Sequence, residues 1–233
     1  MTASLRLAEA REAEGFAVFL ARLLRWDKAA VVRLQASGSV LAVFGQPPFG
    51  GGVVAVRTAE LADTHEVDAT VSAGQLLDGL DGEAGTLAVP AAVTGPAWAG
   101  VLPPRGGWRR LEGLPSPDDV RAVAVAAVTE FRTRSEALTP EHRTRAQLDA
   151  LADDIWSRRL GATGLPLRAV HAAHALGFLR PVRATVPAPR TAGGSGEPAM
   201  DLLAAGAWLR LRTSYGSVAV RRGSGLGLSV SPV

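Results

Sequence analysis

The chain has 233 residues, of which 47% are hydrophobic and 20% are charged, so its composition is that of a folded globular protein. It contains no cysteine, which excludes disulfides, cysteine–zinc sites and thiol catalysis. The formal net charge is +3, and arginine supplies almost all of the positive charge because Lys28 is the only lysine. This modest excess does not by itself indicate an acidic partner.

No stretch of the chain predicts a membrane span or a signal peptide. No apolar run approaches the ~18 residues that suggest a membrane helix. The N-terminal segment carries Arg6, Glu9, Glu12 and Glu14 and has no continuous apolar core, unlike a signal peptide. We therefore expect a cytoplasmic protein that does not bind a membrane.

Residues 3–25 form the first predicted helix, because their apolar side chains recur at helical spacing. Gly15 lies in its middle and is expected to weaken it by up to ~1 kcal/mol. The residues expected to face the core are Leu5, Ala8, Phe16, Phe19, Leu20 and Leu23.

Four short strands are predicted next, and together they indicate an antiparallel meander. They are expected at residues 30–36, 39–44, 53–57 and 66–71. Ser37-Gly38 is typical of a tight turn between the first two. The other connections are also too short for helical crossovers, which favours antiparallel pairing.

The next segment predicts a short helix, a fifth strand and a long connection. Residues 72–75 fit a capping box that begins the helix, and residues 87–93 fit the strand. The connection, residues 95–115, is rich in glycine and proline but holds Trp98 and Trp108. Two tryptophans indicate that it packs against the domain.

Three helices are predicted in the second half of the chain. Residues 116–119, Ser-Pro-Asp-Asp, are a strong helix start and precede apolar residues at helical spacing. Thr139 and Pro140 predict the start of a second helix that ends before Gly161, and Pro166 begins a third that ends near Gly177. Residues 183–198 predict a mobile loop, and 223–233 a frayed tail.

A basic hairpin is predicted at residues 208–222, with Leu209 and Leu211 facing inward and Arg210 and Arg212 facing outward. A helix, a short turn, a second helix and a hairpin follow one another in the winged helix-turn-helix. The net charge from Ile155 to the end is +8, against −5 for the rest, which agrees with an anionic partner. The candidate phosphate contacts are Arg158, Arg159, Arg168, Arg210, Arg212, Arg221 and Arg222.

The helix that would read bases in such an arrangement is poor in suitable side chains. Base recognition needs Arg, Asn, Gln or Ser on the exposed side, and this helix offers Arg168 among alanines. Small side chains favour close packing against protein. Nucleic-acid binding is therefore the alternative hypothesis and not the leading one.

Four patterns that resemble catalytic, metal or nucleotide sites are better explained by structure. His171 and His174 are one turn apart but have no nearby carboxylate to complete a metal site. The glycine-rich loop 45–52 lacks the Lys-Ser/Thr of a phosphate loop, and Gly223–Gly227 opens no helix. Asp153-Asp154 lies on a helix, where adjacent side chains diverge, so it is no acid–base pair. We expect no cofactor and no metal.

Two pieces of the sequence resemble segments of an uncharacterised family of small actinobacterial proteins. One is Pro103-Pro104-Arg105-Gly106-Gly107-Trp108. The other runs from Leu165-Pro166 to Leu176-Gly177-Phe178-Leu179. The family has no known function, so the resemblance implies only the type of source.

The sequence predicts an α+β fold: an antiparallel sheet in the N-terminal half packed with helices, and a helical C-terminal region with a basic β-hairpin. The expected regions are 1–115 and 116–233, which are one domain if the hairpin joins the sheet. The leading hypothesis is a non-enzymatic interaction protein that binds another protein or itself as a homodimer. The alternatives are nucleic-acid binding and an enzyme without a recognisable motif.

Overall fold

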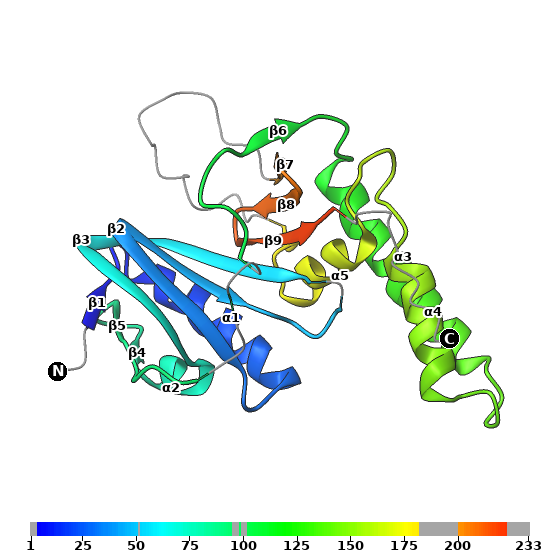
Figure 1. Cartoon of the computed structure of the whole chain (residues 1–233), viewed down its shortest axis with the longest axis horizontal. Helices are drawn as coiled ribbons and strands as arrows, with labels where there is room; N and C mark the ends of the chain where they lie inside the picture. The colour runs from blue at the N-terminus through cyan, green and yellow to red at the C-terminus, as the bar shows by residue number, and fades with distance from the viewer. Residues whose placement is uncertain (1–3, 51, 95–97, 99–101, 182–199, 223–233) are drawn as a thin grey trace, which may run out of the picture.

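The computed structural model describes residues 4–50, 52–94, 98, 102–181 and 200–222. The predicted loop 183–198, the tail 223–233 and the motif Gly223–Gly227 lie outside them. Figure 1 shows the elements in chain order. They are β1 (Ser4–Arg6), α1 (Arg11–Trp26), β2 (Val31–Gly45), β3 (Val54–Ser72), α2 (Ala73–Asp78), β4 (Leu80–Asp81), β5 (Thr86–Ala88), β6 (Arg109–Leu111), α3 (Pro117–Glu136), α4 (Arg145–Trp156), α5 (Leu167–Ala175), β7 (Met200–Ala205), β8 (Trp208–Thr213) and β9 (Gly216–Arg221).

The strands form two antiparallel sheets, which confirms the α+β prediction. The main sheet has the order β2-β3-β9-β8-β7-β6, and the small sheet has the order β1-β5-β4. The predicted basic hairpin is β8 and β9, and it belongs to the main sheet because β9 pairs with β3. One sheet therefore contains strands from both sides of residue 115.

β2 and β3 are two long strands, so the predicted turn at Ser37-Gly38 is wrong. They pair continuously from Val31–Ser72 to Gly45–Ala55, apart from a register shift next to Gly38. Gly38 has a φ of 61°, a left-handed conformation that a bulge can use as readily as a turn. Four predicted strands are thus one hairpin with an irregularity in its middle.

The predicted first helix begins too early. Ser4–Arg6 is a strand that pairs with β5, and α1 starts at Arg11. Leu5 is buried in either arrangement, because a single apolar residue fits the core face of a strand as well as that of a helix. Ala8, which the helical spacing placed in the core, is exposed.

The helices of the second half follow the predicted order, with one shifted start. α3 begins after Ser116, whose side chain accepts a hydrogen bond from the backbone N–H of Asp119. α4 begins after Thr144 and not after Thr139, because residues 139–143 form a separate turn. The strand predicted at residues 87–93 is also wrong in extent, because β5 spans only Thr86–Ala88.

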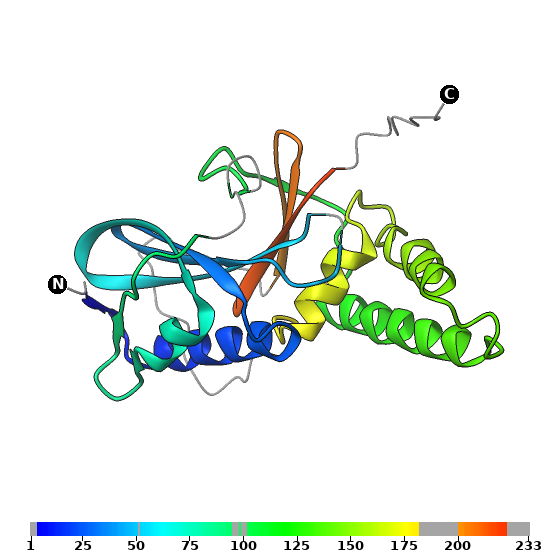
Figure 2. The same cartoon turned by 60° about the horizontal axis from the view of Figure 1, so that its bottom comes forward.

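Helices cover one face of the main sheet. α1 lies along β2 and β3, while α5 packs on β8 and β9 and separates them from α3 (Figures 1 and 2). α3 and α4 pack against each other and extend to one side of the molecule. The largest fully buried side chains of this core include Phe16, Phe19, Leu34 and Leu41.

A smaller apolar cluster lies on the opposite face of the main sheet. Trp98 is buried in it and Trp108 packs against it, which confirms that the described parts of the glycine- and proline-rich connection lie on the sheet. The other buried members are Phe44, Val54, Val56, Trp208 and Ala219. The sheet is therefore covered on both faces near Trp208. Within the described part of the chain, no helix has the length and apolarity to cross a membrane.

Candidate functional site

A cleft of about 400 Å³ opens where β3 separates from the β8–β9 hairpin. β3 pairs with β9 over only Val54–Val56. Farther along β3, the carbonyl of Glu60 accepts a hydrogen bond from the backbone N–H of Ala8, at 2.9 Å. Arg57, Thr58 and Ala59 lie between these two contacts and line the cleft. The start of α1 and the turn between β8 and β9 form its other walls.

Arg57 is the most deeply buried charged side chain of the cleft, with 8% of its surface exposed. Its Nη1 donates a hydrogen bond to the backbone oxygen of Tyr215 at 2.6 Å, and its Nη2 donates to the carboxylate of Glu12. Its Nε has no hydrogen-bond partner among the described residues. The ion pair with Glu12 joins α1 to β3, and the bond to Tyr215 joins both to the hairpin.

Arg212 is neutralised by a buried carboxylate. Its Nη2 donates to Oδ2 of Asp201 at 2.7 Å, and Asp201 is only 2% exposed. Nε of Arg110 lies 2.9 Å from the other oxygen, Oδ1, without the geometry of a hydrogen bond. Asp201 therefore lies between two guanidinium groups on the same sheet face.

Arg210 differs from Arg57 and Arg212, because no carboxylate in the described part of the chain pairs with it. Its Nε donates to Oγ of Ser217 at 2.8 Å, and its guanidinium lies 5.7 Å from the ring centre of Trp108. Burial lowers the pKa of Arg210, and the positive charge of Arg212 lowers it further. Within the part of the chain that the structure describes, this partly buried cation therefore has no counterion.

Acidic side chains line the opposite wall of the cleft. Glu9 pairs with Arg11, and Glu12 pairs with Arg57. Glu60 is exposed, and no ion-pair partner for it occurs among the described residues. The cleft thus has a basic wall from the hairpin and an acidic wall from the N-terminal half.

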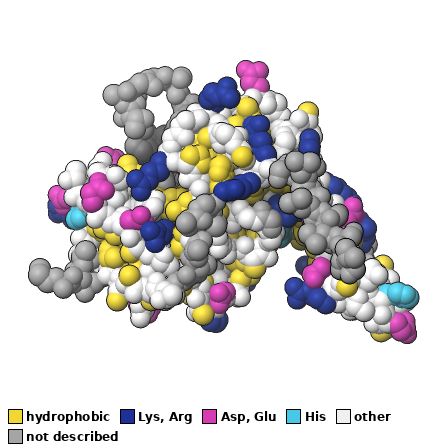
Figure 3. Space-filling view, in the orientation of Figure 1, with side chains coloured by type: hydrophobic (Ala, Val, Ile, Leu, Met, Phe, Trp, Pro, Cys, Tyr) yellow, Lys and Arg dark blue, Asp and Glu magenta, His cyan; other side chains and the backbone are white. Residues whose placement is uncertain are grey.

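The seven arginines predicted as phosphate contacts fall into two separate groups. Arg210 and Arg212 share one face of the sheet, as predicted, since they lie opposite Ala219 and Ser217 in the pairing with β9. Arg221 lies over the ring of Trp208, and Arg222 is exposed at the end of β9. Figure 3 shows arginine side chains gathered around this part of the molecule.

The second group consists of Arg158, Arg159 and Arg168 in the helical region. Two of these three arginines pair with carboxylates of the same chain. Arg158 donates to Glu130 and Asp154, and Arg168 donates to Asp153 at 3.0 Å. Arg159 is exposed. Asp153 and Asp154 thus bind separate arginines, and Asp154 and Arg158 form an i,i+4 pair.

The Ala-rich face of α5, the helix that would read bases in a winged helix, is buried within the protein, while Arg168 and His171 are partly exposed and His174 is exposed. Ala169, Ala172 and Ala173 are fully buried, between the sheet and α3. The small side chains allow this close packing inside the chain. The Ala-rich face is therefore not available to nucleic acid or to a protein partner.

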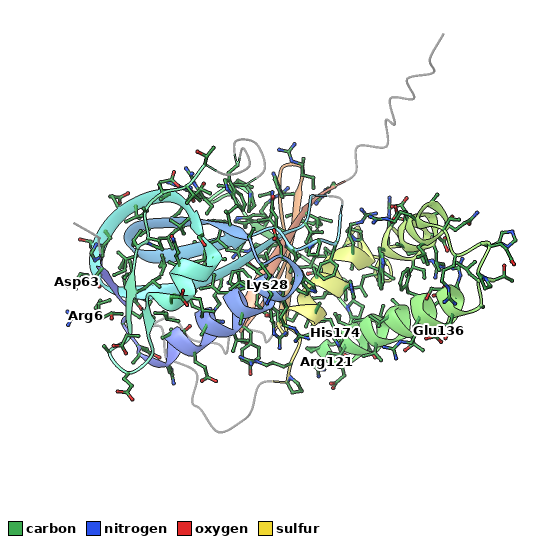
Figure 4. All side chains as sticks on the ribbon, turned by 90° about the horizontal axis from the view of Figure 1, so that it is seen from below. Arg6, Lys28, Asp63, Arg121, Glu136 and His174 are labelled. Atoms are coloured by element: carbon green, nitrogen blue, oxygen red, sulfur yellow. The ribbon has the colours of Figure 1, made fainter. Side chains whose placement is uncertain are left out.

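His171 and His174 do not converge on a metal site. The ring of His171 stacks on Trp156 at 4.3 Å and meets Phe49 edge-on at 4.6 Å, while His174 is exposed at the surface (Figure 4). Burial lowers the pKa of His171 to about 4, with a smaller contribution from His174. Among the described residues, no three His, Cys, Asp or Glu side chains are grouped to hold a metal. The contact between the rings of Phe49 and His171 also confirms that the loop after β2 lies over neighbouring structure.

The cleft residues Arg57, Glu12 and Ser217 were not among the predicted site residues. One sequence signal points to them: Arg57 ends the apolar run Val53-Val54-Ala55-Val56, and a charge at the end of a buried strand needs a partner. Sequence alone cannot show that this partner is Glu12. Nor can it show that Ser217 lies beside them, because the pairing of β3 with β9 brings that residue from the other half of the chain.

Residues 103–225 match the sequence model of a family described as a domain of unknown function, DUF8185. The chain belongs to this family. Residues 1–100 match a second domain of unknown function, DUF8010. These matches confirm the expectation of an uncharacterised family. Searches of curated proteins and of solved structures found no match.

The cleft lies where the two family segments meet. The DUF8185 segment supplies Arg210, Arg212 and Ser217, and the DUF8010 segment supplies Glu12 and Arg57. Neither segment alone encloses the site. The contact between the segments is therefore what creates the cleft.

Proposed function

We propose that the protein is a non-enzymatic interaction module that binds an anionic group of its partner in the cleft. The observation that carries the proposal is Arg210, whose partly buried guanidinium has no carboxylate partner in the described structure. Removing a charge from water without a counterion is unfavourable, and a bound anion would offset that cost. The other two arginines of the cleft already have acidic partners.

The hydrogen bonds of the cleft support binding in preference to catalysis. The hydroxyl of Ser217 accepts from Arg210, and that of Thr213 donates to the backbone oxygen of Gly216 at 2.9 Å. No histidine lies among the residues that line the cleft to activate either hydroxyl. A cytoplasmic location is part of the proposal and is supported by the absence of cysteine.

The partner's anion is expected to be a carboxylate or phosphate group. With Nε bound to Ser217, the two terminal nitrogens of Arg210 remain as parallel donors, a geometry that suits both anions. Another protein, or a second copy of this chain, can present such a group. The proposal therefore keeps self-association as one form of the interaction.

The test follows the side-chain Nε–H signal of Arg210 by NMR during titration with acetate and with phosphate at low ionic strength. We expect a saturable shift of this signal with at least one anion, together with a shift of the backbone amide signal of Ser217 that is lost in Arg210→Gln. The matched control is Arg222→Gln, which removes the same charge from an exposed position outside the cleft lining. If the backbone amide signal of Ser217 shifts with the anion in Arg210→Gln as it does in the unaltered protein, the proposal is refuted.

A further inference from the structure

β3 has a short open edge inside the cleft. At one end of it, Val56 pairs with Ser217 of β9; at the other, Glu60 accepts a hydrogen bond from Ala8, and Leu61 bridges Leu7. Four residue steps separate Val56 from Glu60, which is about 13 Å of extended chain. The open edge is therefore closed at both ends by the protein's own strands.

Thr58 presents its backbone groups to this open edge. Backbone N–H and C=O groups of successive residues in a strand point to alternate sides. The carbonyl of Glu60 points away from β2, toward Ala8. The backbone N–H and C=O groups of Thr58, two residues earlier in the strand, therefore point the same way. No backbone hydrogen bond joins Thr58 to another described segment on that side. Among the described residues, Thr58 thus keeps one unbonded donor and one unbonded acceptor of a β-ladder in the cleft.

The guanidinium of Arg210 lies next to this edge. Its Nε binds the hydroxyl of Ser217, and Ser217 is the residue opposite Val56 in the sheet. The charged end of Arg210 therefore lies next to the Val56–Ser217 pair of the sheet, two residues before Thr58. Both Arg210 and Thr58 line the same cleft.

We infer that the cleft binds the C-terminal end of an extended polypeptide, with its terminal carboxylate on Arg210 and its last peptide groups hydrogen-bonded to Thr58. This inference rests on the proposed function and names its partner. An internal segment of a strand would need to continue past the open edge, where β9 and the residues before α1 block it. A chain end needs no such continuation, and its carboxylate supplies the counterion that Arg210 lacks.

The experiment uses the whole protein and two pools of random hexapeptides, one with free C-terminal carboxylates and one amidated at the C-terminus. We follow the backbone amide signal of Thr58 and the Nε–H signal of Arg210. The free-acid pool is expected to shift both signals and to bind at least about tenfold more tightly than the amidated pool, as is usual for loss of a charge-assisted pair. Arg210→Gln should abolish the difference between the pools.

Each other result decides against a specific step. Equal binding of both pools, or a shift of Arg210 without Thr58, would overturn the C-terminal mode. If neither pool binds while acetate or phosphate still shifts Arg210, the peptide inference fails and the anion-binding function stands. If acetate and phosphate also leave Arg210 unchanged, the proposed function itself fails.

Discussion

The guanidinium of Arg57 occupies the space where a side chain at Gly15 would lie. A Cβ built at Gly15 would overlap Nη2 of Arg57 and lie 2.8 Å from Cζ of the same guanidinium. The glycine that weakens α1 as an isolated helix therefore allows a buried arginine of β3 to reach Glu12 and Tyr215. The helix and the cleft depend on the same missing side chain.

Gly15→Ala should destabilise the protein, although alanine normally favours a helix interior by about 1 kcal/mol. The methyl group would displace Arg57 from its two partners, for a net loss of about 1–3 kcal/mol in the free energy of unfolding. Urea denaturation measures it. Gly74→Ala in α2 is the control, since its nearest neighbour would be 3.7 Å away, and it should not be destabilised. A Gly15→Ala protein as stable as the control would contradict the role assigned to Arg57.

Arg210→Met combined with Ser217→Ala should stabilise the protein in the absence of ligand, by about 0.5–2 kcal/mol. The double change removes an unneutralised charge together with the hydroxyl bound to it, so no buried polar group is left unpaired. Arg57→Met is the contrasting variant and should destabilise, because Glu12 loses its partner. Chemical denaturation of all three proteins in a chloride buffer at low ionic strength checks this. A destabilised double variant would mean that Arg210 supports the fold and is not held for a ligand.

Acidification should destabilise the fold through His171. Its pKa in the folded protein is about 4, against 6.5 for the ordinary side chain, so the unfolded chain takes up a proton first as the pH falls. The contribution of neutral His171 to the free energy of unfolding is fully present above pH 6.5 and is lost as the pH falls from 6.5 toward 4. Allowing for partial exposure of the ring, it amounts to about 2–3 kcal/mol.

The measurement compares the free energy of unfolding against pH for the unaltered protein and for His171→Phe, which keeps an aromatic ring between Trp156 and Phe49. The difference between the two curves should change across this window. His174→Gln, at an exposed position, should retain most of the pH dependence. A flat difference curve for His171→Phe would show that the histidine is not titrated by unfolding.

Asp201→Asn should cost about 1–3 kcal/mol in the free energy of unfolding. The carboxylate is 2% exposed and accepts from Arg212, and the neutral amide would remove the negative charge that faces the guanidinium groups of Arg212 and Arg110. Asp149→Asn removes an exposed acidic partner of Arg145 and should change stability by less than about 0.5 kcal/mol. Equal effects of the two changes would show that burial of Asp201 adds nothing to its pairing.

Duplex DNA should not be retarded by micromolar protein at ~50 mM salt, a condition in which even non-specific binders show measurable affinity. Arg158, Arg168 and Arg212 already bind carboxylates of the same chain, and the Ala-rich face of α5 is buried. A gel-shift assay tests this directly. Retardation whose log–log salt slope falls by about 2 when Arg210 and Arg212 are both changed to Ala would establish nucleic-acid binding through the sheet.

The parts of the fold that could be predicted from sequence are those specified by local chemistry. Ser72 and Ser116 cap α2 and α3 as expected, because an N-cap depends on residues only three positions apart. The strands predicted at residues 30–36 and 39–44 both lie in β2, which begins at Val31. The same local logic failed at Gly38, where a bulge and a turn use the same backbone conformation.

The candidate site could not be predicted because it is built from distant segments. The sequence identified Arg210 and Arg212 as sharing a face, but it did not reveal that Asp201 neutralises only one of them. The alanines of α5 were correctly associated with close packing. They pack against the sheet and α3 of the same chain. The spacing of residues in the sequence does not reveal this arrangement.

The pairing of Val54 with Ala219 has a consequence for how the chain is made. On the ribosome, β2 and β3 emerge long before β9 exists, so the edge of β3 must wait unpaired while most of the chain is synthesised. Contacts between residues so distant in sequence also form slowly. Before β9 is made, the nascent N-terminal half is therefore the part of the chain that most needs a chaperone. At that stage a neighbouring nascent chain could pair with the exposed edge of β3 in place of β9.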